Sequence, residues 1–544
     1  MKHQDTADVV IIGAGAAGAA FAWRLSGMGL NIVCLEQGYW VKSEASPSQD
    51  ENWELALQTR FHPNPNIRKA PSDYPVDTVN SDIEPANYNA VGGSTIRWGA
   101  HFPRLHPSDF KVATLDGVGC DWPISYSDLE PYYDLNDQMM GVCGLAGDPA
   151  NPPRTPRPFP PLPLCTGTTR LQTAFDQLGW HWWPSDAAIQ TQDSDSRQAC
   201  NFCGPCGLGC PRKARASVDI TYWPLAIKQG VTLKTGCTVL QVNTNSKGTR
   251  AESVHYIDAS GEHKMLVANT IVLAASGMGT PRLLLASLTN KMGSNSSDRL
   301  SEIGRNLMLH PTAIVSGVFS QSLKTYQGPF ACSLFSQEFY ETDLRRGFVR
   351  GCQLQALRSQ GPLGTALGGY MSRLPWGTDH HERFTHGFNH TVSITVTSED
   401  LPEPSNFIDL AVGDTDSRGM VIPRMHYKVG ENTQKILHFG IAKATELLRA
   451  AGAHNVNVNP LSRQAGFHFM GTARMGNDED KSVVSAEGRC HAINNILVID
   501  GSVFPSAGAV NPTSTLQAFA LRCADALLDT LIPTTNDRLL RHGS

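Results

Sequence analysis

The feature that most constrains the fold is a glycine-rich turn close to the N-terminus. The short apolar run at residues 9–12 predicts a strand buried on both faces, and it stops at Gly13. Small, helix-forming residues follow over 16–28, and a second buried strand is predicted over 31–35 before Glu36. These segments make one βαβ unit, so we expect a parallel sheet with a right-handed crossover.

The same turn predicts a dinucleotide-binding site. Gly13, Gly15 and Gly18 have the spacing G-x-G-x-x-G between a strand and a helix. The first glycine allows the tight turn, the second lets a pyrophosphate approach the backbone, and the third lets helix and strand pack closely. Glu36 follows at the distance expected of a carboxylate that accepts hydrogen bonds from the adenosine ribose hydroxyls. The motif alone does not separate FAD from NAD.

Composition indicates a globular protein that binds a small molecule. The chain has 544 residues, 41% of them apolar, and a formal charge of −5 without any block of five like charges. That length suits two or three domains, and that charge gives no reason to expect nucleic acid or an anionic membrane. The N-terminus lacks the features of a signal peptide and no stretch reaches eighteen apolar residues. By its own sequence we expect a cytoplasmic chain without membrane insertion, and export as the passenger of a partner subunit stays open as an alternative.

Further strands are expected to join the first sheet. Their signals lie at residues 231–235, 238–242, 254–257 and 270–275. A helix is expected to begin at Thr280, with Pro281 near its first turn. The proline-rich segments 41–90 and 145–164 are expected to be irregular connections.

Residues 311–460 have a different pattern. They alternate in the manner of an antiparallel sheet, as at 391–397, and include an amphipathic helix over 433–451. This stretch is the best candidate for a substrate-binding domain.

A second set of motifs occupies the last eighty residues. His468 precedes a Gly-Thr turn, and an apolar strand over 495–499 ends in Asp500 and Gly501. Asn511, followed by proline, opens a helix. Taken with the glycine-rich N-terminus, this segment resembles the glucose-methanol-choline (GMC) oxidoreductases, which are flavoenzymes that oxidise alcohols. The resemblance covers nearly the whole chain.

The resemblance implies an α/β fold in which a Rossmann-like FAD-binding domain is joined to a mostly antiparallel-sheet substrate domain. The FAD-binding domain is expected to be discontinuous, over residues 1–40, 86–110, 190–310 and 461–544. The substrate domain is expected over 311–460 with parts of 41–85 and 111–189.

A second glycine loop is similar to the GMC loop that lies along the flavin and its phosphates. It contains Gly92, Gly93 and Ser94 and ends near Trp98. In several relatives a histidine just before this tryptophan is bonded covalently to the flavin. Arg97 occupies that position here, and an arginine does not form this linkage, so FAD is expected to be non-covalent.

Oxidation of an alcohol removes a hydroxyl proton and a carbinol hydride, so the site needs a base, a partner for the oxygen and an electron acceptor. By the match to the GMC motif, His468 is expected to be the base and Asn511 its hydrogen-bonding partner. Asp500 and Gly501 are expected to contact the cofactor. His310 lies in the family's crossing between domains and is expected to be a buried interface histidine. Sugar and sterol relatives share the Asn-Pro pair, which favours ring-bearing secondary alcohols.

Four of the thirteen cysteines lie together. Cys200, Cys203, Cys206 and Cys210 have the ferredoxin spacing C-x₂-C-x₂-C-x₃-C-P. Some GMC sugar dehydrogenases have C-x₅-C-x₃-C here and bind a three-iron cluster, and this chain matches those positions with Cys203 in addition. The pattern predicts a [3Fe-4S] or [4Fe-4S] cluster that would pass electrons to an acceptor subunit or cytochrome. Structural thiols and zinc stay open as alternatives, and the other nine cysteines are expected to be inert.

The function that these patterns favour is an FAD-dependent alcohol or sugar dehydrogenase. The nearest rival is an oxidase that passes electrons to oxygen and makes hydrogen peroxide. A flavo-iron electron carrier without a small substrate would explain the glycine turn and the cysteines, but it would leave His468 and Asn511 without a purpose.

Overall fold

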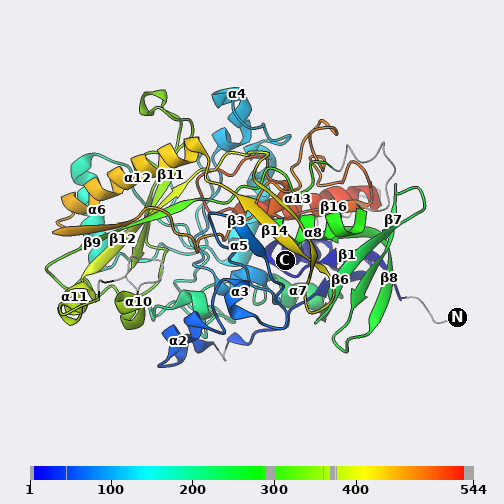
Figure 1. Cartoon of the computed structure of the whole chain (residues 1–544), viewed down its shortest axis with the longest axis horizontal. Helices are drawn as coiled ribbons and strands as arrows, with labels where there is room; N and C mark the ends of the chain where they lie inside the picture. Colours follow the sequence, from blue (N-terminus) through cyan, green and yellow to red (C-terminus); the bar gives the residue numbers. More distant parts are fainter. Residues whose placement is uncertain are drawn as a thin grey trace.

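The structure is a computed structural model that describes residues 5–43, 46–288, 301–358, 361–367, 374 and 376–531. Two large β-sheets lie toward opposite ends of its long axis (Figure 1). A smaller sheet of three strands lies between them (Figure 1). This is the predicted class, an α/β fold with one Rossmann-like sheet and one antiparallel sheet.

The seven-stranded sheet is built on the predicted βαβ unit. β1 (Asp5–Ile12) pairs in parallel with β2 (Ile32–Glu36), and α1 (Ala16–Leu25) connects them. The strand order is β5–β2–β1–β8–β7–β6, and β16 pairs in parallel with β8. The remaining strands are β5 (Thr232–Thr235), β6 (Thr238–Thr244), β7 (Ala251–Ile257), β8 (His263–Leu273) and β16 (Ile496–Val498). β6 and β7 pair antiparallel, so the sheet is mixed rather than wholly parallel.

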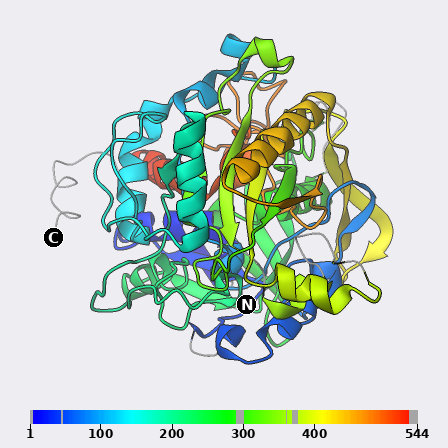
Figure 2. The same cartoon turned by 90° about the vertical axis from the view of Figure 1, so that its left-hand side faces the viewer.

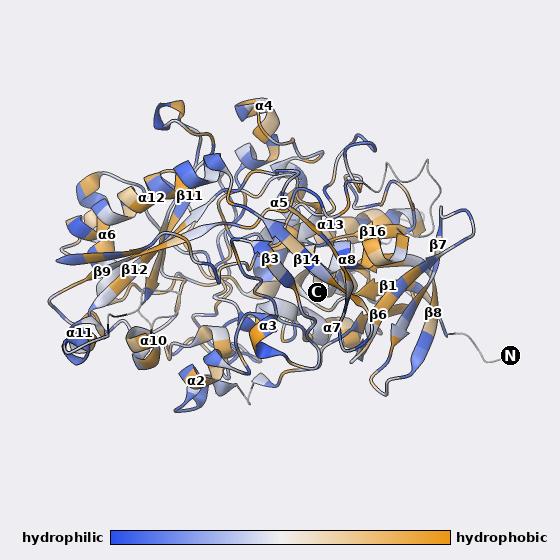
Figure 3. Ribbon diagram, in the orientation of Figure 1, coloured by the Kyte–Doolittle hydropathy of each residue, from blue (hydrophilic) through white to orange (hydrophobic). Residues whose placement is uncertain are grey.

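Helices α1 and α13 (Thr513–Leu531) pack against each other beside this sheet, and α1 also contacts α7 (Tyr222–Lys228). α5 (Tyr126–Met140) also packs against α13. Apolar residues are concentrated where β1, β16 and α13 meet (Figure 3). Burial of these apolar residues fixes the position of the N-terminal end of α13, and therefore of Asn511, which lies two residues before that helix.

One helix begins earlier than the sequence predicts. α8 (Ser276–Leu288) starts four residues before Thr280, so Pro281 lies inside it. Proline has no N–H to donate to the carbonyl four residues back, which is that of Gly277. The hydroxyl of Thr472 donates to that oxygen at 2.8 Å instead, so a residue distant in sequence makes the early start tolerable.

The six-stranded antiparallel sheet has the order β15–β9–β12–β11–β10–β4. Its strands are β4 (Trp183–Pro184), β9 (Thr312–Val318), β10 (Leu334–Ser336), β11 (Cys352–Arg358), β12 (Thr391–Ser398) and β15 (Asn455–Asn459). α12 (Glu431–Ala450) and α6 (Thr166–Leu178) lie side by side on its outer face (Figure 2). The expected strand at 391–397 and helix at 433–451 are both present, within two residues.

Strict alternation divides the residues of β12 between two faces. Val392, Ile394 and Val396 join the apolar core beneath α12. Thr395 and Thr397 point the other way, because successive side chains of a strand alternate between faces. Both are nonetheless buried, so the polar face of this sheet is covered by the rest of the protein.

The third sheet has the order β13–β14–β3. Its strands are β3 (Asp77–Ser81), β13 (Phe407–Thr415) and β14 (Val421–Tyr427), and the short helices elsewhere include α2 (Trp53–Gln58), α3 (Pro65–Arg68), α4 (Val112–Asp116), α10 (Pro362–Leu367) and α11 (His380–Gly387). Within the described ranges, no helix has both the length and the apolar character needed to span a membrane.

Candidate active site

A cavity of about 1070 Å³ extends from the glycine turn of the first sheet to the polar face of the antiparallel sheet. Its volume lies at the top of the range for ligand sites, so it has room for a dinucleotide together with a small substrate. Its wall includes most of the residues that sequence reasoning selected, namely Gly13, Gly15, Glu36, Gly93, Ser94, Trp98, Cys203, Cys206, His468, Asp500, Gly501 and Asn511.

The two predicted glycine loops meet in this wall. A Cβ on Gly93 would lie 3.0 Å from the Cα of Gly15, and the amide of Gly92 donates to the carbonyl of Ala14 at 3.0 Å. Gly13 has a φ of +104°, and a Cβ there would lie 2.5 Å from the carbonyl oxygen of Ala274. The backbones leave a cradle without side chains, which is what a pyrophosphate needs in order to approach peptide N–H groups.

Gly18, the third glycine of the turn, acts by packing. A Cβ at this position would overlap the carbonyl oxygen of Gly13, so only glycine lets α1 begin against the end of β1. Trp98 is held by a hydrogen bond of 2.8 Å from its indole nitrogen to the carbonyl of Ala216. The hydroxyl of Ser94 accepts a hydrogen bond from the amide of Tyr88.

Two buried carboxylates line the cavity at the ends of strands. Glu36 accepts hydrogen bonds from the amides of Ala14 and Gly38, each at 2.8 Å. Asp500 accepts bonds from the amide and hydroxyl of Ser502 and from the hydroxyl of Thr280. Burial raises the pKa of both carboxyl groups, and these hydrogen bonds oppose the rise. The glycine turn thus orients Glu36, and the first turns of α8, through Thr280, help to orient Asp500.

Arg97 lies at the boundary between the cavity and the cysteine loop. Its guanidinium is stacked between two aromatic rings, 3.9 Å from the centroid of Phe61 and 4.6 Å from that of Tyr88. Its Nη1 is buried and makes no hydrogen bond within the described part of the chain. A cationic group in the cavity wall with an unused donor suits the anionic phosphates of a dinucleotide.

His468 is hydrogen-bonded to His310, a pairing that sequence reasoning missed. The two Nδ1 atoms are 2.9 Å apart, and the Nε2 of His310 lies 2.7 Å from the carbonyl oxygen of Gly508. His310 is buried as expected, but its neighbour is the predicted base rather than only a domain interface. The position of His310 just before Pro311 and β9 gave no signal of this contact, because the two histidines are 158 residues apart.

The carbonyl of Gly508 determines which nitrogens of this pair carry protons. A carbonyl oxygen only accepts, so the Nε2 of His310 must donate and its Nδ1, in the neutral ring, must accept. The Nδ1 of His468 therefore donates to His310. This leaves the Nε2 of His468 without a proton, on a ring that lines the cavity, so the pair presents a lone pair to whatever binds there.

Asn511 lies in the same cavity wall, two residues before the start of α13. Its side-chain oxygen is buried and makes no hydrogen bond among the described residues. An amide oxygen without a donor in a ligand cavity is suited to accept a hydrogen bond from a bound ligand, and the amide's NH₂ group can donate.

The cysteine loop packs directly against the second glycine loop. η5 (Cys206–Leu208) contacts η3 (Gly93–Arg97), and Cys203 and Cys206 line the cavity. Cys200 and Cys210 are half-buried. Within the described chain, no three or more Cys, His, Asp or Glu side chains are arranged so that they could hold a metal ion. This arrangement does not support a single-ion site such as zinc in the loop, and the iron–sulfur cluster stays a prediction.

Comparison with known proteins identifies the family. Two family models described as GMC oxidoreductase match residues 170–312 and 402–520. The 2-methyl-1,2-propanediol dehydrogenase of Mycolicibacterium austroafricanum is 38% identical over 531 residues, which are 96% of this chain and 95% of that protein. This chain belongs to the GMC oxidoreductase family.

Other comparisons agree with this assignment. The fructose dehydrogenase large subunit of Gluconobacter japonicus is 28% identical over 557 residues, 97% of this chain and 98% of that protein. The fold is shared with the pyridoxine 4-oxidase of Mesorbium loti, at a TM-score of 0.65 and 18% identity, over 96% and 99% of the two chains.

As a GMC oxidoreductase, the chain is an enzyme that acts on CH–OH donors, and FAD is the cofactor expected for its family. The glycine cradle, Arg97 and the volume of the cavity fit that cofactor. His101, Gln353 and Thr395, which no sequence motif marked, also have buried polar atoms without hydrogen-bond partners in the described structure.

Proposed function

We propose that this GMC oxidoreductase is a dehydrogenase in which the Nε2 of His468 takes the hydroxyl proton of an alcohol and an external acceptor receives the electrons. The observation that carries the proposal is the His310–His468 pair, whose unprotonated nitrogen lies in a cavity continuous with the glycine cradle. FAD, when bound, supplies the hydride acceptor.

Different side chains are proposed to act on the hydroxyl proton, the substrate oxygen and the cofactor. His468 removes the proton and becomes an imidazolium, while its Nδ1–H stays bonded to His310. Asn511 holds the substrate oxygen, because its amide can donate to a developing alkoxide without giving up a proton. The apolar parts of the wall limit the access of water. Gly13, Gly15, Gly18, Glu36, Gly92, Gly93, Ser94, Trp98, Asp500 and Gly501 are proposed to hold the cofactor.

The experiment that tests this function is anaerobic reduction of the enzyme-bound flavin by a panel of primary alcohols, secondary alcohols, diols and sugars. Members of the panel are expected to bleach the flavin, and an artificial dye is expected to reoxidise it. Stoichiometric oxygen consumption and hydrogen peroxide, at a rate equal to that with dye, would favour the rival function as an oxidase. If no alcohol bleaches the flavin, the proposal fails.

FAD is proposed to be dissociable, because Arg97 stands where relatives carry the covalent histidine. Acid or heat denaturation is expected to release all of the flavin into the supernatant as FAD. Arg97→Gln is expected to weaken FAD binding, since it removes a buried cation from the cofactor cavity. Yellow protein pellets after denaturation would show a covalent linkage and contradict this prediction.

The pH dependence follows from the shifted pKa of the histidine pair. Loss of solvent and the neighbouring His310 hold the pKa of His468 well below its usual 6.5. Since the neutral ring is the base, kcat/KM is expected to fall on the acid side with an apparent pKa below 6.5. The fold should also lose stability as the pH falls below 6.5, the ordinary pKa of the unfolded chain, because the unfolded chain then binds protons that the folded chain resists. An acid limb at or above 6.5, measured by rapid flavin reduction, would contradict this assignment.

An iron–sulfur cluster at the cysteine loop is a separate proposal. Its support is the ferredoxin spacing and the charge around it, since Arg197, Arg215 and Arg358 lie close enough to act electrostatically on its thiols. Arg197 gives its hydrogen bonds to three backbone carbonyls. Burial nonetheless raises the pKa of Cys200 to about 12 and raises that of Cys203, with only a small opposing effect of Arg358 on Cys203, so without bound iron these two residues are thiols at neutral pH. Among the described residues these sulfurs form no group that could hold a metal ion, and no step is derived through a cluster.

Iron and acid-labile sulfide, measured against flavin in an anaerobic preparation, test the cluster. Three or four irons per flavin, with absorption beyond the flavin bands that is lost in Cys206→Ser, would support it. A preparation that contains only flavin and has full dye-linked activity would overturn it and leave the loop as structural thiols.

A further inference from the structure

The polar face of the antiparallel sheet, described above for β12, continues across three strands toward the cavity. Cross-strand pairing places Thr312 of β9 opposite Thr397 of β12, and Thr397 opposite Gln353 of β11. In the next row Thr395 lies opposite Gln355. The alternate residues of the same strands belong to the apolar core beneath α12. A sheet face that is polar and yet buried requires a partner other than bulk water.

One end of this row lies at the histidine pair. The hydroxyl of Thr312 donates to the carbonyl of His310 at 2.8 Å, and His310 holds His468. Thr312 and Thr397 both line the cavity. The row therefore starts where the proposed chemistry takes place.

The other end of the row lies at His101. This histidine lines the cavity and is 3% exposed, and its ring packs edge-on against Phe335 of β10 at 5.5 Å. Burial lowers its pKa to about 4, against smaller upward effects of Asp186 and of the adjacent Gln353. The ring is therefore neutral at physiological pH and offers one donor and one acceptor.

The polar atoms at this end lack partners of standard geometry in the described chain. They are both ring nitrogens of His101, both side-chain polar atoms of Gln353 and the hydroxyl of Thr395. The side chain of Gln353 is near enough to His101 for a distorted hydrogen bond, so one polar atom of each residue is weakly paired with the other. Gln355, by contrast, donates to the carbonyl of Ala331. A buried polar atom without a partner costs roughly 1–3 kcal/mol in a folded protein. His101 and Thr395 line the cavity, so their polar atoms indicate groups that a ligand satisfies, whereas Gln353 lies behind the wall.

We propose that His101 and Thr395, with Gln353 buried behind them, form a subsite that binds a second hydroxyl group of the substrate, remote from the carbinol that is oxidised. The inference rests on the proposed function and names its substrate class. The row crosses two strand spacings of about 4.8 Å each. A substrate that reaches from His468 to this subsite must carry its second hydroxyl several bonds from the reacting carbon. Ring polyols and sugars meet that requirement, and small monohydroxy alcohols do not.

The test compares two alcohols that differ only in the remote hydroxyl, cyclohexanol and trans-cyclohexane-1,4-diol, with the FAD-loaded enzyme. We expect kcat/KM to be roughly ten- to a hundred-fold higher for the diol, the scale of one or two hydrogen bonds to buried groups. Thr395→Val keeps the shape and removes the hydroxyl, so it should reduce this ratio about five-fold or more. Thr395→Ser keeps the hydroxyl and should preserve the ratio.

A second measurement separates the subsite from the catalytic proposal. Binding of cyclohexanone and of 4-hydroxycyclohexanone to the oxidised enzyme is followed by the change in flavin absorption, which requires no turnover. Preference for the hydroxyketone that falls in Thr395→Val and in His101→Leu supports the subsite even if no alcohol reduces the flavin. Equal affinity for the two ketones in the unmodified enzyme, or a preference unchanged in both variants, would overturn it.

Discussion

Replacing His468 with alanine is expected to slow reduction of the bound flavin by substrate by about 10²–10⁴-fold, the usual scale for loss of a general base. The cradle for the cofactor does not involve this side chain, so FAD content should stay the same. The measurement is the first-order rate of flavin bleaching after anaerobic mixing with a saturating alcohol.

His438→Ala is the matched control for this substitution, because it makes the same change on the exposed face of α12. It should bleach at the rate of the unmodified enzyme. If His468→Ala is reduced as fast as that control, the proton is removed by another group. A fall in FAD content together with the rate would show instead that the histidine holds the cofactor site.

A substitution at His310 tests the role of its hydrogen bond to His468. His310→Phe removes the acceptor for the Nδ1–H of His468 while leaving the base in place. The ring of His468 then loses the hydrogen bond that fixes its tautomer, so the rate of flavin reduction should fall and its pH dependence should change. The fall should be smaller than in His468→Ala, because the base itself is still present. An unchanged pH profile would mean that His310 only packs against the base.

The first βαβ unit could be predicted from the sequence because its determinants are local. A buried apolar run, glycines at fixed spacing and a terminal carboxylate act over a few residues. The start of α8 could not be predicted, because the donor that satisfies the carbonyl of Gly277 belongs to Thr472. The first residue of a helix cannot be read from the nearby sequence when it depends on a residue about two hundred positions away.

In the candidate site, too, features with local motifs could be predicted and contacts between distant residues could not. His468 and Asn511 were predicted from motifs, and both lie in the wall of one cavity. His310 was interpreted only as an interface residue, and the subsite around His101 was not anticipated at all. Its residues come from three separate segments, and only the register of β11 against β12 brings Gln353 and Thr395 to the same face. The cysteine spacing predicted a ligand set, but spacing does not determine whether the sulfurs converge.

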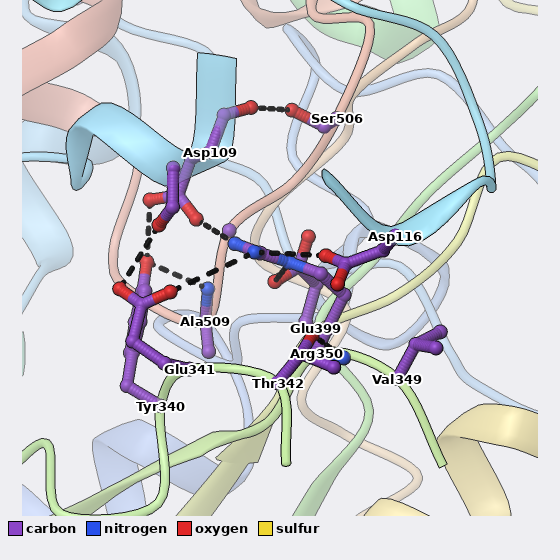
Figure 4. A network of polar contacts seen from close by, with 12 residues as sticks. Asp109, Asp116, Tyr340, Glu341, Thr342, Val349, Arg350, Glu399, Ser506 and Ala509 are labelled. Carbon is purple, nitrogen blue, oxygen red and sulfur yellow. Dashed lines mark hydrogen bonds and ion pairs between the residues drawn. The ribbon is translucent and has the colours of Figure 1, made fainter. Parts of the chain in front are cut away.

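A network of buried charges behind the site leads to the largest expected effect on stability. Arg350 is almost fully buried and forms ion pairs with Asp109, with Glu399 at 2.8 Å and with Asp116 at 3.3 Å (Figure 4). Burial raises the pKa of Glu399 to about 8, and Arg350 opposes that rise. This one guanidinium thus compensates several carboxylates from separate segments of the chain.

The network also holds the segment that bears on the histidine pair. The second oxygen of Asp109 accepts a hydrogen bond from the hydroxyl of Tyr340 at 2.7 Å, and that hydroxyl accepts one from the amide of Ala509 (Figure 4). The neighbouring carbonyl, that of Gly508, is the one that orients His310. A substitution that removes charges from this network should therefore alter the position of the proposed base as well as lower the stability of the fold.

Arg350→Met is expected to destabilise the protein by about 3–5 kcal/mol, because it leaves buried carboxylates without their counter-charge. Thermal and urea unfolding of the FAD-loaded enzyme measure this effect. Arg345→Met is the matched control, since Arg345 forms its ion pair with Asp343 at the surface, where such pairs contribute little. Adding Glu399→Gln to Arg350→Met should recover part of the loss, because it removes one of the uncompensated charges. If Arg350→Met unfolds like the control, the carboxylates are already protonated in the folded protein, and the network does not hold the 506–511 segment by charge.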